Sequence, residues 1–151
     1  METTVVSYLT ARPSRDVVVA GHQQVTRDWW ETRRSAFDVY VSQLVVREAR
    51  EGDPEAAGRR LSVIDELALL DVTSEAEALA FALVEGGVIP SNAGADALHI
   101  AVAAVHGVEY LVTWNMAHIA NAQLRPGIEE VCRRAGFEPP ILCTPEELME
   151  G

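Results

Sequence analysis

Residues 95–115, with the sequence ADALHIAVAAVHGVEYLVTWN, carry the pattern that most directly decides the fold of this chain. Asp96 stands at the head of an almost unbroken apolar run, which predicts a buried helix extending to about His106. Gly107 predicts the turn that ends this helix, and the β-branched and aromatic residues after it predict a strand. Asn115 closes that strand. A helix that leads through a short turn into an apolar strand is typical of an α/β protein.

Helices and short strands alternate along the rest of the chain as well. Strands are predicted at residues 37–42, 68–72, 109–114 and 139–144, and helices at residues 15–34, 43–52, 53–67, 73–88 and 127–136. Residues 1–14 contain only a β-branched apolar patch. Because this alternation favours a parallel sheet covered by helices on both faces, we expect a three-layer α/β/α domain. The length of 151 residues predicts that residues 1–151 form one domain.

Oxygen-bearing side chains from separate segments are expected to meet at one edge of this sheet. The carboxyl ends of parallel strands share an edge, and ligands bind there. Asp96 heads a helix that leads back to a strand, and Asn115 follows the end of that strand, so both belong to this edge. Glu48 lies about two turns into the helix that Ser42 caps, which also begins at the edge.

Each of these residues also has a simpler structural explanation. Asp96 could interact favourably with the helix dipole, Glu48 could be a solvated helix residue, and Asn115 could end the strand in a turn. His99 shares a helix face with Asp96, which would allow it to bind a metal, but it is expected to pack in the core with a hydrogen bond. His118 is expected in a surface loop after the strand, near enough to approach the site.

The composition narrows the classes of function. The net charge of -11 argues against bulk electrostatic binding of nucleic acid and suits a divalent cation site or a basic partner. The chain has no Lys, which excludes a Walker-A phosphate loop or a Schiff-base lysine. Cys132 and Cys143 lack paired spacing and are expected to be free buried thiols. No signal peptide or membrane-spanning run is found, so we expect a cytoplasmic protein.

Three segments together resemble a known family. They are METTVVSYLTARPS at residues 1–14, VSQLVVRE at residues 41–48, and ADALHIAVAAVHGVEYLVTWNMAHIANA at residues 95–122. The third is the most specific, because it combines an acid at a helix head, the ALHIA run, the strand YLVTWN and the following HIAN. The chain resembles, over nearly its whole length, a PIN domain of the VapC-type toxin group.

The resemblance implies a fold and an activity. PIN domains are α/β/α folds with a parallel sheet, and their active members are ribonucleases that depend on Mg²⁺ or Mn²⁺. The active site of the family carries acidic residues at up to four positions. The resemblance implies that Glu2, Glu48 and Asp96 occupy the first, second and third of these positions. Asn115 occupies the fourth, where many members carry an acid. The likeness also implies an RNA substrate, a homodimer and an antitoxin of the VapB type that blocks the site.

Two departures from the family pattern leave an alternative open. Only Met1 precedes Glu2, so either the first strand is truncated or the chain starts further upstream. Asn115 supplies a neutral amide in place of a carboxylate. Both departures favour an alternative interpretation, in which the chain is a catalytically weak PIN-like module that acts by binding protein or RNA. A phospho-receiver domain is disfavoured because the chain has no Lys, and a dinucleotide-binding domain because no Gly-rich turn follows a first strand.

Overall fold

Two short parallel sheets occupy the centre of a mixed α/β fold. The computed structural model describes the whole chain, Met1–Gly151. Strand β1 (Tyr40–Ser42) pairs with β2 (Ala68–Leu70), and strand β3 (Tyr110–Val112) pairs with β4 (Ile141–Cys143). Each pair is parallel and three residues long, so each strand is shorter than the segment that the sequence predicts. The four strands themselves lie where the alternating pattern predicts them.

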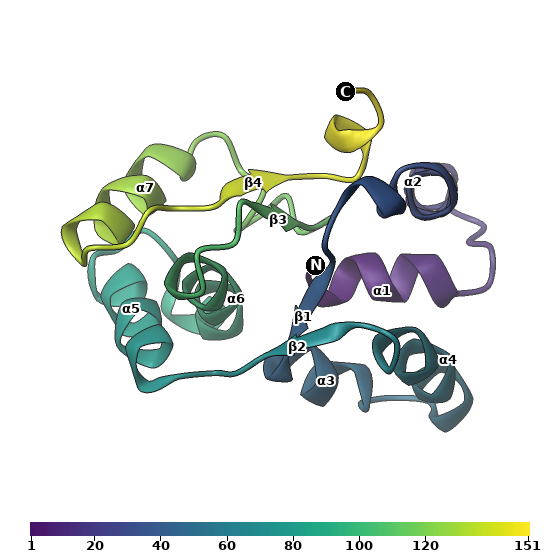
Figure 1. Cartoon of the computed structure of the whole chain (residues 1–151), viewed down its shortest axis with the longest axis horizontal. Helices are drawn as coiled ribbons and strands as arrows, with labels where there is room; N and C mark the ends of the chain where they lie inside the picture. The colour runs from purple at the N-terminus through teal and green to yellow at the C-terminus, as the bar shows by residue number, and fades with distance from the viewer.

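The first two residues lie between the two sheets (Figure 1). The amino group of Met1 donates a hydrogen bond to the carbonyl of Tyr40 in β1, at 2.8 Å. The N–H of Glu2 donates to the carbonyl of Val112 in β3, at 3.0 Å. Met1 and Glu2 therefore occupy the position of a strand between β1 and β3. These two residues link β1 to β3 by one hydrogen bond each.

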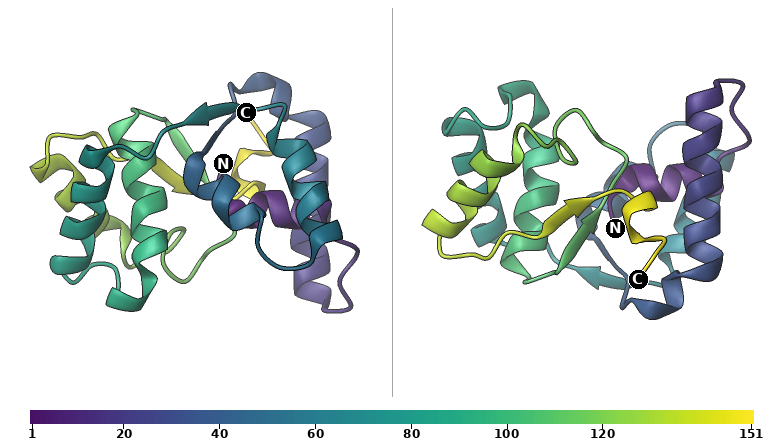
Figure 2. Two further views of the ribbon diagram at one scale, coloured as in Figure 1. Left: turned by 90° about the horizontal axis from the view of Figure 1, so that it is seen from below. Right: turned by 90° about the horizontal axis from the view of Figure 1, so that it is seen from above.

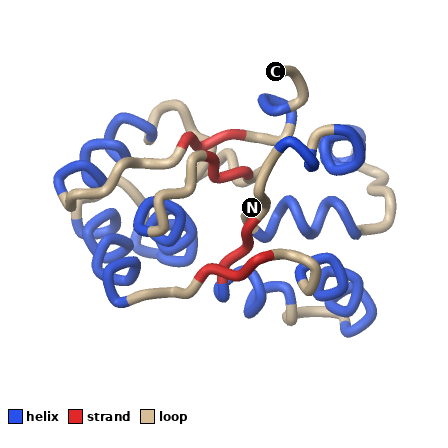
Figure 3. Tube along the Cα trace, viewed as in Figure 1, coloured by secondary structure: helices blue, strands red, loops and turns tan.

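Seven α-helices surround these sheets, and loops join most of them to the short strands, whereas α3 follows β1 directly (Figure 3). Helices α1 to α4 gather at one end of the molecule, and α5, α6 and α7 gather at the other (Figure 2). Their bounds are α1 Thr3–Thr10, α2 Val17–Thr32, α3 Gln43–Ala49, α4 Pro54–Ile64, α5 Ser74–Glu85, α6 Gly94–Val105 and α7 Arg125–Arg134. Short 3₁₀ turns occupy Arg34–Ala36, Ser91–Ala93 and Glu146–Leu148.

Side-chain caps explain where several helices begin. Ser42, Asp53 and Thr73 each accept a hydrogen bond from a backbone N–H three residues later, and they start α3, α4 and α5 as the sequence predicts. Helix α2 begins at Val17, two residues after its predicted start at residue 15. Asp16 caps this helix by accepting from Val19 N–H, because the Ser14 hydroxyl instead accepts from the N–H of Asp16.

Helix α1 is the element that the sequence pattern does not reveal. Residues 1–14 show only a β-branched apolar patch, and β-branched residues have slightly lowered helix propensity. In the fold Val5 and Val6 are completely buried, and the Glu2 carboxylate caps the helix by accepting from Thr4 N–H. Burial and a cap together outweigh the weak local propensity here.

The helix and strand that decide the fold form as predicted. Helix α6 ends before Gly107, whose φ of 67° lies in the left-handed region that glycine adopts without a Cβ clash. Ile100 and Ala101 of α6 are completely buried in the largest apolar cluster, together with Leu83 of α5. This helix therefore stands at the centre of the main core, and its rigid packing fixes the positions of Asp96 and His99.

Cys132 and Cys143 are free and buried, as predicted. Burial raises the pKa of the Cys132 thiol to about 11 and that of Cys143 to about 12. Both side chains therefore act as small apolar groups at neutral pH. Separately, none of the helices is both long and apolar enough to cross a membrane.

Replacing Leu83 tests the main core. Leu83 is completely buried, whereas Phe81 on the same helix is 67% exposed. We expect Leu83→Ala to lower the free energy of unfolding by about 2–5 kcal/mol, because it removes packed methyl groups and leaves a cavity. Phe81→Ala should change it by less than about 0.5 kcal/mol. Urea denaturation followed by circular dichroism measures both, and equal losses would contradict this description of the core.

Candidate metal centre

The carboxylate of Glu2 is buried, and its direction is fixed by hydrogen bonds. Only 4% of the residue is exposed. Its Oε2 accepts from the Thr4 N–H at 3.1 Å, from the Thr4 hydroxyl, and from the Thr113 hydroxyl at 2.7 Å. Its Oε1 accepts no hydrogen bond and lies 3.9 Å from His99 Nε2. One oxygen of this buried carboxylate is therefore satisfied, and the other is turned toward a second ionisable group.

Two threonines tie Glu2 to the end of strand β3. The Thr113 hydroxyl accepts from Asn115 N–H at 2.9 Å while it donates to Glu2. The Thr4 hydroxyl accepts from Trp114 N–H at 2.9 Å while it also donates to Glu2. Each hydroxyl thus connects the carboxylate to a backbone group just after the strand. The position of Glu2 is set by the carboxyl end of β3 rather than by the short N-terminal segment alone.

Glu48 reaches the same place from helix α3. Ser42 caps this helix directly after β1, so the helix begins at the carboxyl end of the strand. Glu48 Oε1 accepts from the Thr3 hydroxyl at 2.6 Å and from His99 Nε2 at 2.6 Å, since a carboxylate can only accept. Its Oε2 makes no hydrogen bond, and the side chain is 30% exposed. Glu48 therefore keeps one oxygen open at the mouth of the site.

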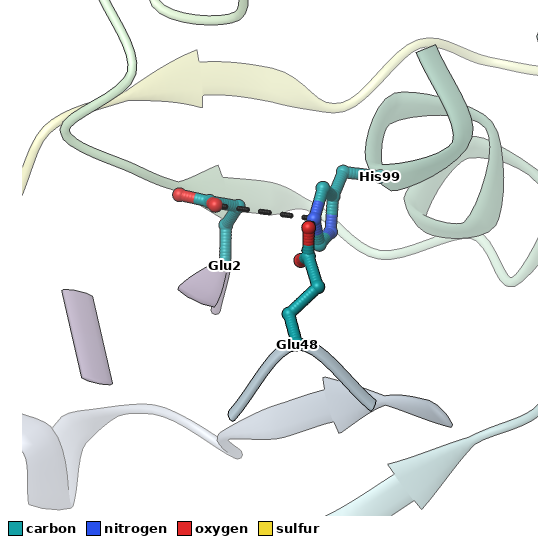
Figure 4. A group of neighbouring side chains, drawn as sticks. All are labelled: Glu2, Glu48 and His99. Atoms are coloured by element: carbon teal, nitrogen blue, oxygen red, sulfur yellow. Dashed lines mark hydrogen bonds and ion pairs between the residues drawn. The ribbon is translucent and has the colours of Figure 1, made fainter. Parts of the chain in front are cut away.

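His99 completes a cluster of three possible metal ligands. Its side chain is only 3% exposed, and its Nε2 faces the carboxylates of both Glu2 and Glu48 (Figure 4). One ligand atom from each of these residues lies within 4.8 Å of the others. The residues come from the start of α1, from α3 and from α6. Segments that are far apart in the chain therefore converge in the Glu2–Glu48–His99 cluster.

Asp96 and Asn115 lie in an adjoining cluster with His118. Asp96 is three residues before His99 on α6, and its Oδ2 accepts from His118 Nδ1 at 2.8 Å. The Asn115 side-chain oxygen accepts from His118 N–H at 3.1 Å, and its backbone carbonyl accepts from Ile119 and Ala120. Asn115 therefore shapes the turn after β3, in agreement with its simpler structural explanation.

The sequence prediction of the site is partly reflected in this geometry. The structure brings Glu2 and Glu48 together, and it places Asp96 and Asn115 in the adjoining cluster rather than among the three nearest ligands. His99 was expected to be a core residue with a hydrogen bond, which it is, but its partner is the Glu48 carboxylate. The spacing of three residues from Asp96 was the only sequence signal for this position.

Glu48 is held in its ionised form. Burial would raise the pKa of its carboxyl group, but hydrogen bonds from His99 and Thr3, together with the positive charges of His99 and Arg47, outweigh that effect. The pKa of Glu48 therefore lies below its ordinary value of 4.5. An ionised carboxylate with an open oxygen beside a second buried carboxylate is a favourable environment for a divalent cation.

The donor set fits a divalent cation, with a preference that depends on His99. Two open carboxylate oxygens suit Mg²⁺ or Mn²⁺, and an imidazole nitrogen favours transition metals over Mg²⁺. His99 Nε2 carries the proton that bonds Glu48, so it would have to lose this proton to become a ligand. The cluster can therefore act with His99 as a ligand, or with His99 as the group that orients Glu48.

Comparison of the chain with models of protein families, with curated proteins and with solved structures finds no match. Any function must therefore be inferred from the residues themselves. The cluster offers carboxylates, an imidazole and hydroxyl groups, which are the groups used in metal-assisted hydrolysis.

Removing the Thr3 hydroxyl tests the electrostatics of the site. Thr3→Val deletes a hydrogen bond to ionised Glu48, so the pKa of Glu48 should rise toward its ordinary value. Carbon-detected NMR titration of the Glu48 carboxyl measures the change. Thr10→Val is the matched control, because the Thr10 hydroxyl on the same helix bonds only the carbonyl of Val6. An unchanged titration in Thr3→Val would show that this hydrogen bond does not act on Glu48.

The lowered pKa also has a consequence for stability. A carboxyl group whose pKa is lower in the folded state contributes stability above its unfolded pKa, and this contribution disappears as the pH falls through the folded value. Wild-type protein should thus lose stability below about pH 4.5 more steeply than Glu48→Gln, which has no such group to protonate. Thermal melts across acidic pH measure the difference, and parallel pH profiles for the two proteins would contradict it.

Proposed function

We propose that this chain is a metal-dependent ribonuclease of the PIN domain and VapC toxin type. In this proposal the fold is a three-layer α/β/α PIN-like domain in which Met1 and Glu2 lie between the two sheets. The observation that carries the proposal is the convergence of Glu2, Glu48 and His99 from three separate segments. A buried carboxylate with an open oxygen is costly unless a cation compensates its charge, which favours a metal centre over a purely structural cluster.

Glu2 and Glu48 would hold Mg²⁺ or Mn²⁺ through their open oxygens. Asp96, one helical turn from His99, and Asn115 would act from the adjoining cluster, on water or on a second ion. A cation bound there supplies a water of lowered pKa and neutralises charge on the scissile phosphate. With His99 as a third donor, Mn²⁺ would be preferred to Mg²⁺.

The protein groups would prepare the site for this chemistry. The two threonine hydroxyls hold Glu2 in one orientation and stabilise its charge, so the open oxygen needs no rearrangement. His99 keeps Glu48 ionised and directed inward by donating a hydrogen bond to it. Preorganised donors of this kind support a hydrolytic role more than passive binding.

The charge distribution favours an RNA substrate that is bound through a few local contacts and not over a broad surface. The net charge of -11 disfavours broad electrostatic binding of RNA. Arg47 on α3 and Arg50, which follows the helix as its C-cap, are nevertheless exposed and form no ion pair. These two guanidinium groups are suited to contact phosphates close to the cleavage point. An antitoxin of the VapB type would block the site with a basic side chain, and a homodimer is the expected assembly.

A second candidate function is a catalytically weak PIN-like module that binds protein or RNA. Two contacts favour it. The Asn115 amide oxygen is engaged by His118 N–H, and the Asp96 carboxylate is engaged by the ring of His118. If these bonds persist in solution, only two carboxylates remain for a metal. Calorimetric titration with Mn²⁺ distinguishes the candidates, because the nuclease requires saturable binding at or below millimolar concentration and the module does not.

Cleavage assays on charge-neutral variants test the nuclease proposal. We expect Glu48→Gln and Glu2→Gln each to lower Mn²⁺-dependent cleavage of a mixed pool of fluorescent RNA oligonucleotides by about 100-fold or more, because each removes an anionic ligand. Glu66→Gln is the control, since Glu66 is exposed and forms no ion pair. Melting temperatures show whether each variant is folded. Full activity in a folded Glu48→Gln variant would remove Glu48 from the mechanism, and cleavage equal with and without metal would end the proposal.

A further inference from the structure

A cavity of about 610 Å³ separates the two sheets. Strands β1 and β3 form two of its sides, α6 contributes Val102 and Ala103, and Trp29 and Phe37 line it from the end of α2 and the segment that follows. Of its 20 lining residues, 14 are hydrophobic. Figure 1 shows that the N-terminus lies between the two sheets, and Met1 lines the cavity. An apolar space of this size is suited to an apolar ligand of several residues.

The two strands that border the cavity present open hydrogen-bonding edges to it. In a strand, successive residues direct their backbone groups to opposite sides. The Val112 carbonyl bonds Glu2, so Tyr110 and Val112 face the cavity while Leu111 faces β4. The Tyr40 carbonyl bonds Met1, so Tyr40 faces the cavity from β1. Apart from these two bonds, no hydrogen bond crosses the gap from either strand.

Open edges on both sides favour a peptide over a compact apolar molecule. A strand inserted between β1 and β3 would pair its backbone with both edges and place its side chains against α6 on one face and Trp29 on the other. Both existing strand pairs are parallel, and an insert that continues this pattern would run parallel to β1 and β3. At about 3.3 Å per residue, four residues span about 13 Å.

The opposite end of the cavity carries two unpaired acids. Asp38 precedes β1 and Glu109 precedes β3, both line the cavity, and both are exposed without an ion-pair partner. Because a parallel insert would enter with its N-terminal residue at this end, the two carboxylates would lie beside that residue. A basic side chain there would complement their charge.

We propose that this cavity is a docking site for an extended segment of a partner protein, with a basic residue followed by about four apolar, β-forming residues that complete a continuous sheet. This inference does not rest on nuclease activity. Because His99 and Ser42 also line the cavity, docking would change the surroundings of the Glu2–Glu48–His99 cluster. A protein segment bound there would therefore influence the metal centre from within the fold.

The test uses a synthetic peptide of one arginine followed by four alternating valine and isoleucine residues. We expect saturable binding by calorimetry and slower amide exchange at Tyr110 and Val112 in NMR spectra. Leu111 is the internal control, because its N–H faces β4 and should exchange as before. A peptide with proline at the second and fourth positions lacks the required N–H groups and should not bind. Equal binding of the proline peptide, or no protection of Tyr110 and Val112, would overturn the proposal.

Variants of the acidic end and of the N-terminus sharpen the test. The double variant Asp38→Asn/Glu109→Gln should bind the arginine peptide with about fivefold lower affinity. Its affinity for a peptide with alanine in place of arginine should be unchanged. The same peptide sequence fused directly before Met1 should occupy the cavity covalently and abolish binding of the free peptide. If the fusion protects Tyr110 and Val112 but the free peptide never binds, the occupant is a segment of the same chain, and the assignment to a partner protein is wrong.

Discussion

The buried carboxylate of Glu2 is the constraint on which the centre of this fold depends. One of its oxygens accepts hydrogen bonds from two threonine hydroxyls, Thr4 in α1 and Thr113 directly after β3. Because the N–H of the same residue bonds β3 and the preceding amino group bonds β1, the link between the two sheets depends on two residues. The fold thus joins its halves at the position where it also buries a negative charge.

That charge explains why neighbouring groups are arranged as they are. An ionised carboxylate in a buried position requires hydrogen bonds or an opposite charge. Threonine hydroxyls satisfy one oxygen of Glu2, and the ring of His99 stands opposite the other while it bonds Glu48. The result is a cluster whose carboxylates have open oxygens in a restricted space. Under the proposed function, a divalent cation supplies the remaining compensation.

The sequence predicts the helices and strands of this structure better than the contacts between them. The caps at Ser42, Asp53 and Thr73 and the turn at Gly107 follow from local chemistry, so they can be recognised from the residues alone. Helix α1 is missed because its stability comes from the burial of Val5 and Val6, which is a property of the whole fold.

The site shows the same division. Placing Glu48 at the edge depends on topology, and topology is legible in the alternation of helices and strands. Glu2 was predicted only through the resemblance to PIN domains, and its place beside Glu48 depends on the hydrogen bonds that Met1 and Glu2 make to the two sheets. The pairing of His99 with Glu48, and of Asp96 with His118, depends on side-chain directions that spacing does not define. Likewise, a pattern of residues cannot give the volume of the cavity between the sheets.

Crystals grown with millimolar Mn²⁺, with anomalous scattering data collected at the manganese edge, test the central claim most directly. The account predicts an anomalous peak at the position of a manganese ion that Glu2 Oε1 and the Glu48 carboxylate coordinate. The hydrogen bond between Glu48 and His99 should then be broken or longer. An empty cluster at that concentration, with the Glu48 and His99 side chains still bonded to each other, would contradict it.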